Sequence, residues 1–155
     1  MKPPKPFLPF PLPIHVGTDI CRVSRIASLL AHPTRGRRFV DRVLSPEERS
    51  LPRVRRALGE GYHGEGPWGP EAAEFMAGRF AAKEAAFKAH PFRRLTWHEI
   101  AIRPANEAEE SGPTIAVIRG EKADQAAMVS ISHDGDYATA VCLGFDPSNS
   151  KLDTP

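Results

Sequence analysis

Cysteine is scarce in this sequence, and long apolar runs are absent. Its 155 residues include two cysteines, Cys21 and Cys142, and no Cys/His spacing typical of a zinc site. A disulfide framework is therefore not expected, and a reducing intracellular compartment is favoured. No stretch approaches the roughly 18–20 apolar residues needed to cross a bilayer, so we expect a soluble protein without a membrane partner. The length suits one compact domain with its own core.

Acidic residues are missing from the first 18 positions and rare in the segment that follows. The first acid is Asp19, and residues 22–56 hold ten arginines against three acids, a net charge of +7. Residues 57–155 carry a net charge of −6. A basic segment of this kind indicates an anionic partner, which could be a nucleic acid, a membrane surface or an acidic protein. A solvated basic face without a partner is the alternative.

The beginning of the chain is rich in proline, with five prolines among the first eleven residues. Proline at this density excludes a helix and favours an extended conformation. The segment lacks both the arginine- and serine-rich pattern of a transit peptide and the apolar core of a secretory signal. We divide the chain into a proline-rich extension (1–13), a folded domain (14–144) and a disordered polar tail (145–155).

Hydrophobic spacing predicts helices in the first half of the folded domain. A short strand over 14–18 should lead into a helix with Thr18 or Asp19 as its N-cap. The sequence SPEE (45–48) is typical of a capping box, which should start a second helix that runs towards residue 58. A long helix should span about 71–89, after a glycine- and proline-rich loop.

Strands are predicted in the second half of the domain. They lie over 95–103 and 113–118 and in a hairpin over 128–144, which turns at Asp134-Gly135. Helices followed by strands predict an α+β fold with an antiparallel sheet.

The long predicted helix carries an unusual stripe at spacings of three and four. Its members are Ala77, Ala81, Glu84 and Lys88, so two small residues lead to a carboxylate and an ammonium group one turn apart. Small side chains let a ligand or another chain approach the backbone. A Glu–Lys pair four residues apart is also an ordinary helix stabiliser worth about 0.2–0.5 kcal/mol. Taken alone, this helix favours the structural explanation.

Other polar residues make a phosphate or metal site conceivable. Mg²⁺ takes one or two carboxylates from a protein and fills its other positions with water and phosphate oxygens. Asp19 lies at a predicted strand-to-helix junction, where a cap carboxylate can face a ligand. Ser130, Ser132 and His133 lie near the end of a predicted strand before a tight turn, where polar groups can converge on a phosphate.

Three segments together resemble the holo-acyl-carrier-protein synthases, the small type of 4′-phosphopantetheinyl transferase. They are GTDICRVSRI (17–26), FMAGRFAAKEAAFKA (75–89) and SISHDGDYATAVC (130–142), of which GRFAAKEA is the most specific. The resemblance covers about residues 14–144. It implies a compact α+β unit with an antiparallel sheet packed against a long helix, assembled as a homotrimer with coenzyme A bound between subunits.

The resemblance also implies a reaction. Such an enzyme moves 4′-phosphopantetheine from coenzyme A to a serine of an acidic acyl carrier protein, in fatty-acid synthesis or another pathway, and releases 3′,5′-ADP. Asp19 and Glu84 would bind Mg²⁺ together with the coenzyme A diphosphate. Lys88 would contact the phosphates and offset charge on the leaving group. We expect Glu84, or a metal-bound water that it holds, to accept the proton of the serine.

Further positions match residues that bind the two substrates in the family. Ser132 and His133 match positions that line the coenzyme A site. Arg25 matches the arginine that docks the acidic helix of the carrier protein, with Leu29 on the same face and His32 near the end of the same predicted helix. The arginine excess would then meet an acidic partner, which mainly raises the association rate and the specificity.

The sequence departs from the family pattern in two places. Arg22 stands where an acid commonly follows the metal aspartate by three positions. HPFRRL (90–95) replaces a glycine-containing loop, so Arg93 and Arg94 could bind phosphates by their side chains instead of by backbone amides. The two arginines could equally be solvated. Residues 59–70 lie outside the resemblance and receive no function.

Two alternatives to this enzyme stay open. One is a module that binds nucleic acid or an anionic surface through the arginine-rich segment 35–56, although no aromatic platform or groove-reading motif accompanies the arginines. The other is a catalytically inactive relative that acts as a scaffold. For the enzyme we expect no nucleic-acid partner, and a mitochondrial or cytoplasmic location with a lean towards mitochondria because the start is basic.

Overall fold

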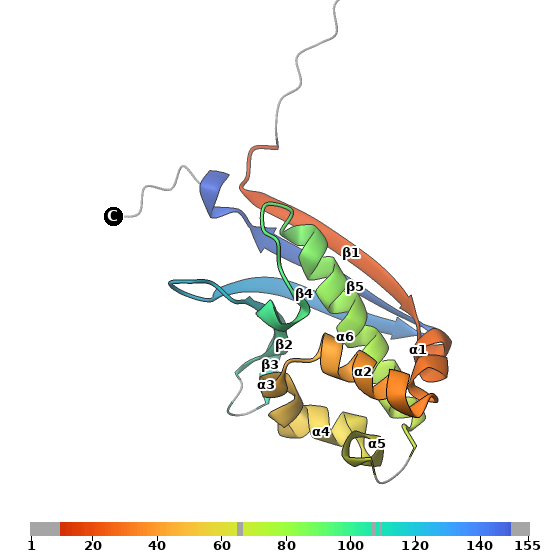
Figure 1. Cartoon of the computed structure of the whole chain (residues 1–155). Helices are drawn as coiled ribbons and strands as arrows, with labels where there is room; N and C mark the ends of the chain where they lie inside the picture. Colours follow the sequence, from red (N-terminus) through yellow and green to blue (C-terminus); the bar gives the residue numbers. More distant parts are fainter. Residues whose placement is uncertain (1–9, 65–66, 107, 109, 150–155) are drawn as a thin grey trace, which may run out of the picture.

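A five-stranded antiparallel sheet with a long helix across one face forms the framework of the protein (Figure 1). The computed structural model describes residues 10–64, 67–106, 108 and 110–149. The strands are β1 (Ile14–Arg22), β2 (Ile100–Asn106), β3 (Ser111–Ile118), β4 (Gln125–Asp134) and β5 (Tyr137–Phe145), in the spatial order β1-β5-β4-β3-β2. The helices are α1 (Val23–Leu30), α2 (Pro33–Val43), α3 (Pro46–Ser50), α4 (Pro52–Leu58), α5 (Glu60–His63) and α6 (Pro70–Ala89), with 3-10 turns η1 (Trp97–Glu99) and η2 (Pro147–Asn149). The predicted α+β class, an antiparallel sheet on a long helix, is confirmed.

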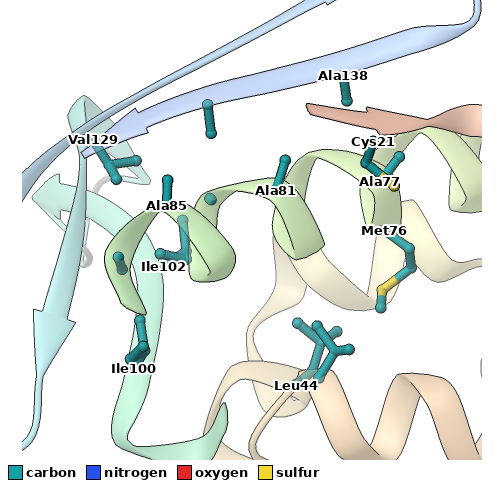
Figure 2. Close-up of a cluster of buried hydrophobic side chains, with 14 of the residues drawn as sticks. Cys21, Leu44, Met76, Ala77, Ala81, Ala85, Ile100, Ile102, Val129 and Ala138 are labelled. Atoms are coloured by element: carbon teal, nitrogen blue, oxygen red, sulfur yellow. The ribbon is translucent and has the colours of Figure 1, made fainter. Parts of the chain in front are cut away.

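Small residues let α6 lie directly on the sheet. Along β5 the buried residues alternate with exposed ones, and those that face α6 are Ala138, Ala140, Cys142 and Gly144. A Cβ atom at Gly17 of β1 would lie 1.9 Å from the carbonyl oxygen of Ala85, which no side chain could tolerate. Figure 2 shows alanines of α6 beside residues of the strands. The alanine-rich composition of α6 thus serves a close contact between helix and sheet.

A second part of the core lies between α6 and the shorter helices. Met76 of α6 and Leu44, which follows α2, are fully buried there, and Ile100 and Ile102 of β2 close the cluster on the sheet side (Figure 2). Burying an apolar side chain of this size contributes about 1.5–3 kcal/mol to folding. This packing fixes the position of α6 from both sides.

Strand β1 is longer than the sequence indicated, and this moves Asp19. The strand pairs with β5 along all of Ile14–Arg22, so the predicted N-cap at Thr18 or Asp19 is wrong. Asp19 lies inside the strand, and α1 begins only at Val23. Pairing with a strand that is more than a hundred residues away overrides the local helix pattern.

The helical half of the chain also differs in detail. Helix α2 was not predicted; it begins at Pro33, a favoured first helical residue, after His32 as N-cap. The predicted helix after the SPEE motif divides in two because Pro52 starts α4. The capping box itself is confirmed: the Ser45 side chain accepts from the Glu48 amide, and the Glu48 carboxylate accepts from the Ser45 amide.

The loops and the tail hold more structure than expected. The loop over 59–70 contains α5, and residues 97–99 form η1, so β2 starts at Ile100 and not near residue 95. Phe145 belongs to β5 and Pro147–Asn149 form η2, so the disorder expected over 145–155 is wrong for these residues. Residues 150–155 and 1–9 lie outside the described residues, and the division into extension, domain and tail stays a prediction.

Candidate functional site

A lysine–aspartate contact joins α6 to β1 at the edge of the sheet. The Nζ of Lys88 donates to Asp19 Oδ1 at 2.8 Å and to the Thr18 carbonyl at 2.8 Å. The Asp19 side chain is 17% exposed and that of Lys88 is 51% exposed. We call Asp19, Lys88 and the neighbouring Glu84 the β1-edge cluster. It brings together two residues that are 69 positions apart in the chain.

Glu84 lies one turn before Lys88 on α6 and is half-buried. Within the described part of the chain its carboxylate makes no hydrogen bond and no ion pair. The expected Glu84–Lys88 pair is therefore wrong as an explanation of this stripe, because Lys88 reaches across to Asp19 instead. Glu84 is therefore the carboxylate of this cluster that no described residue engages, and it is accessible to a ligand.

The β1-edge cluster has the donor set of a magnesium site that is shared with a substrate. Among the described residues no group of three or more His, Cys, Asp or Glu side chains could hold a metal ion. Asp19 and Glu84 flank Lys88 and would supply two carboxylates. Mg²⁺ usually keeps one or two carboxylates and completes its octahedron with water and phosphate oxygens, so this pair fits.

The lysine next to Glu84 has a different task. Lys83 is fully buried, and its Nζ lies 2.5 Å from Glu48 Oε2 while it also donates to the carbonyls of Val43 and Trp97. The other oxygen of Glu48 accepts from the Ile102 amide. Burial lowers the pKa of Lys83, and the charge of Glu48 opposes this shift. The network ties α6 to α2, α3, η1 and β2, so Lys83 is a structural residue.

A second cluster, absent from the sequence predictions, surrounds Arg79 of α6. Arg79 is 4% exposed, and no described residue accepts a hydrogen bond from its Nε. Its guanidinium lies 4.6 Å from the centre of the Phe75 ring. Burial, together with the nearby charge of Arg53, lowers its pKa to about 10. We call Arg53, Arg79 and His133 the arginine cluster.

Two open grooves meet at the arginine cluster. One, of about 470 Å³, is lined by Arg53, Arg79, His133, Ser130 and Thr114 among others. The other, of about 350 Å³, lies between Arg79 and β2. The larger groove is lined by two arginines and a histidine, Arg53, Arg79 and His133, and this basic lining favours an anionic ligand. The only sign of this cluster in the sequence is Arg79 itself, a charged residue among the small residues of GRFAAKEA.

The structure separates Ser132 from His133, which the sequence analysis placed together. Side chains alternate along a strand, so they leave β4 on opposite faces. His133 lies on the α6 side, with Nε2 3.3 Å from the Glu74 carbonyl and close to Gly78. Ser132 pairs with Thr139 on the uncovered face of the sheet. Within one chain the two residues do not face the same space.

The proposed docking residues lie on and beside α1. Arg25 is exposed, with its guanidinium 5.5 Å above the Phe80 ring, and Leu29 is half-buried. His32 does not belong to α1: its Nδ1 accepts from the Arg35 amide and caps α2. This role explains His32 without a partner protein.

Aromatic side chains gather between α2, α6 and η1. The Phe39 ring contacts that of Phe80, and the Trp97 ring stacks on Phe80 and meets Phe87 edge to face. Arg42 of α2 lies 5.9 Å above Trp97, as Arg25 lies above Phe80. Arg42 was not singled out in the sequence, because its neighbour Trp97 is 55 positions away.

The remaining arginines divide into paired and unpaired ones. Arg93 donates to the Arg119 carbonyl, whereas exposed Arg94 has no partner in the described part of the chain. Arg37 and Arg49 both pair with Asp41, so the segment 35–56 is less uniformly basic than its composition indicates.

None of the helices in the described ranges is both long and apolar enough to span a bilayer.

Comparisons with known proteins agree on one family. Residues 15–142 match the model of a family described as the 4′-phosphopantetheinyl transferase superfamily. The chain is 38% identical over 148 residues to 4′-phosphopantetheinyl transferase B, mitochondrial, of Aspergillus fumigatus, which covers 88% of this chain and 96% of that protein. It is 35% identical over 145 residues to a holo-[acyl-carrier-protein] synthase of Desulforudis audaxviator, covering 88% and 95%.

A solved structure shares the fold. It is a holo-(acyl-carrier-protein) synthase of Bacillus anthracis in complex with CoA (3′,5′-ADP), with a TM-score of 0.59 and 29% identity, and the match covers 83% of this chain and 93% of that chain.

Proposed function

Because the chain belongs to the 4′-phosphopantetheinyl transferase superfamily, we propose that it is a holo-acyl-carrier-protein synthase. It transfers 4′-phosphopantetheine from coenzyme A to a serine of an apo acyl carrier protein and releases 3′,5′-ADP. The observation that carries this proposal is the β1-edge cluster, in which Lys88 holds Asp19 beside a carboxylate, Glu84, that has no partner among the described residues.

Asp19 and Glu84 would hold Mg²⁺ together with phosphate oxygens of coenzyme A. Bound there, the ion neutralises charge on the diphosphate as it develops. Asp19 is held in place by Lys88, and Glu84 is held by the helix that Lys83 anchors. The two carboxylates therefore come from two different elements with fixed positions.

The remaining steps need only positioned charges. Glu84 accepts the proton of the carrier serine while the serine oxygen forms a bond to the phosphorus that bears the pantetheine. The bond from that phosphorus to the bridging oxygen breaks, and the bridging oxygen leaves with 3′,5′-ADP. Lys88, with an exposed ammonium group, offsets the charge on the leaving phosphate. Phosphoryl transfer of this type depends mainly on positioning and charge stabilisation.

The arginine cluster would bind other phosphates of coenzyme A. Arg53 and Arg79 line both grooves, and His133 lines the larger one. Arg94, exposed and unpaired among the described residues, is the better candidate of the HPFRRL pair, since Arg93 is engaged with a backbone carbonyl. Ser132 would contribute from the uncovered face of the sheet.

An acidic carrier protein would dock on α1 and α2. Arg25 and Leu29 lie on α1, and Arg42 extends the basic rim along the aromatic side chains that lead to Glu84. Charge complementarity of this kind mainly raises the association rate.

We also propose a homotrimer. The sheet face opposite α6 exposes apolar side chains, with Val16 67%, Ile20 65% and Met128 70% exposed. Contiguous apolar surface of this kind marks an interaction site. Ser132 lies on that same face, so a neighbouring copy could use it together with its own β1-edge cluster. Sedimentation equilibrium should give three times the 17.0 kDa mass of the chain, and the mass of a single chain would contradict the proposal.

A mitochondrial location is part of the proposal. The Aspergillus fumigatus relative is named mitochondrial, and residues 1–18 contain two lysines and no acid. Microscopy of the full-length protein fused to a fluorescent protein tests it, and a diffuse cytoplasmic signal would contradict it.

The decisive experiment is mass spectrometry of an apo carrier protein incubated with this protein, coenzyme A and Mg²⁺. We expect the carrier to gain one phosphopantetheine, and the gain to vanish with EDTA. Glu84→Gln should lower turnover at least about 10²-fold, the usual lower contribution of a positioned acid–base group. Glu71→Gln, an exposed carboxylate on the first turn of the same helix, is the matched control and should keep full turnover. Full turnover by Glu84→Gln would contradict the role of Glu84.

A further inference from the structure

The N-terminus of α1 is capped by a residue from the other end of the chain. The amide of Ser24 donates to Asp136 Oδ1 at 2.7 Å, and the Ser24 hydroxyl donates to Asp136 Oδ2 at 2.6 Å. The amide of Val23 donates to the Asp136 carbonyl at 2.8 Å. Asp136 therefore accepts three hydrogen bonds from the first turn of α1.

Helix α1 has no cap of its own. Its N-cap residue Arg22 makes no capping hydrogen bond with its side chain, and the first turn contains no acid. The first amides of a helix lack partners inside the helix, and the positive end of its dipole favours a carboxylate. Asp136 supplies both the acceptors and the charge. Its pKa is lowered first by the hydrogen bond from the Ser24 side chain.

The backbone around Asp136 is held in a tight turn. Asp134 and Tyr137 are the last paired residues of β4 and β5, so the turn has only Gly135 and Asp136 at its centre. Gly135 has φ +53°, which suits a hairpin turn with glycine in first place. A two-residue turn leaves the Asp136 carboxylate little freedom relative to the hairpin.

Arg22 adds a second link between the same two elements. Its Nη2 donates to the Tyr137 hydroxyl at 3.2 Å, and its guanidinium lies 5.6 Å from the centre of that ring. Its Nε is 3.9 Å from Asp136 Oδ2. The arginine that replaces the expected acid at this position thus takes part in holding α1 to the hairpin.

We propose that Asp136 is a positioning residue for the carrier protein: it fixes α1, which carries Arg25 and Leu29, on the β4–β5 turn. The inference rests on the proposed function, since α1 is the proposed docking helix. A helix of eight residues is marginal by itself, so this cap adds to the buried contacts of Ile26 and Leu30 in fixing its direction. Without Asp136 the docking face would lose its fixed orientation relative to Glu84, while the carboxylates and Lys88 would stay where they are.

The test compares kinetics for the two substrates in the full-length Asp136→Ala variant, because asparagine would keep an acceptor for the Ser24 amide. We expect KM for the apo carrier protein to rise about tenfold, which corresponds to about 1.4 kcal/mol. We expect KM for coenzyme A, and kcat at saturating carrier protein, to stay within twofold. Ser24→Ala removes one of the three hydrogen bonds and should raise the same KM by a smaller factor. Equal changes in both KM values would indicate general damage to the fold and would overturn the inference.

A matched control lies two positions away. Asp134 is exposed at the same turn, and its side chain has no partner in the described part of the chain, so Asp134→Ala should leave both KM values unchanged. An increase as large as that of Asp136→Ala would show a mere effect of charge near α1, and would overturn the inference.

Amide hydrogen exchange separates this inference from the proposed function. In Asp136→Ala the amides of α1 should exchange at least about tenfold faster, while those of α6 keep their rates, because only α1 loses the carboxylate that caps it. Unchanged exchange in α1 would overturn the inference whether or not transfer occurs. Absence of transfer by the unsubstituted protein would overturn the proposed function and the docking role with it, and the exchange rates would still show whether Asp136 anchors α1.

Discussion

Two lysines on α6, five positions apart, make ion pairs that differ in exposure: one pair is buried in the core and the other is open to solvent. Lys83 and Glu48 are 0% and 1% exposed, and four further backbone groups complete their hydrogen bonds. Lys88 and Asp19 are 51% and 17% exposed, at the edge of the sheet. The buried pair can only hold elements together, because no ligand reaches it. The edge pair can exchange its partner for a substrate, so the same residue types serve structure in one place and chemistry in the other.

The largest expected effect breaks the buried pair. Lys83→Met should destabilise the protein by about 3–5 kcal/mol, because it leaves Glu48 charged and unpaired in the core. Lys88→Met is the matched control and should cost less than about 1 kcal/mol, since its pair is half-exposed. Urea denaturation measures both. Equal losses in the two variants would contradict the division of roles between the lysines.

The next effect concerns turnover, for which Lys88 should matter more than it does for stability. Lys88→Met should lower kcat about 10²-fold, the usual effect of removing one group that stabilises charge in the transition state. Mass spectrometry of the carrier protein over time measures it. Lys88→Arg, which keeps the charge, should recover part of the rate. A Lys88→Met enzyme with normal kcat would leave Lys88 only a structural role beside Asp19.

A substitution that alters the distance between β1 and α6 tests whether the edge pair depends on packing. Gly17→Ala should destabilise the protein by about 1–3 kcal/mol, because its Cβ would collide with the Ala85 carbonyl. Turnover should also fall, since Asp19 lies two residues further along the displaced strand. A Cβ atom at Gly69 meets no atom within 4 Å, so Gly69→Ala is the control for rate; because Gly69 is the N-cap of α6, where alanine is disfavoured, it is not a control for stability. Normal turnover with lowered stability would show that Asp19 tolerates the displacement.

The smallest effect comes from a buried base without a charged partner at the end of α6. His90 is fully buried, and burial lowers its pKa below the ordinary value of 6.5 despite a hydrogen bond with the Ala86 carbonyl. Below pH 6.5 the His90 side chain is therefore protonated in the unfolded chain but stays neutral in the folded protein. The free energy of unfolding then falls as the pH falls. Urea midpoints between pH 8 and 5 should fall less in His90→Gln than in the unsubstituted protein. Parallel curves would contradict this assignment.

Part of the fold was readable from local pattern because its causes are local. The capping box at Ser45 and Glu48 needs residues three positions apart, and the β4–β5 hairpin needs a glycine between two strands. The candidate residues Asp19, Glu84 and Lys88 came from a resemblance in three segments, and the structure brings Asp19 and Lys88 into contact.

The errors have one physical origin, which is contact between distant residues. Lys83 received no role from the sequence, because Glu48, its partner in the core, is 35 positions earlier in the chain. Asp19 looked like a helix cap because pairing with β5 cannot be seen locally. Ser132 and His133 are adjacent in the chain, yet the alternation of a strand places them on opposite faces of the sheet.

The sequence by itself determined the α+β class, the alanine-rich helix and the family, because these depend on composition, periodicity and short motifs. Only the tertiary structure decided which charges are buried, which are free for a ligand, and how α1 is anchored. Burial and pairing depend on the position of every neighbour in space. The Asp136 carboxylate that caps α1 at Ser24 lies 112 residues away in the chain, and no local pattern predicts such a contact.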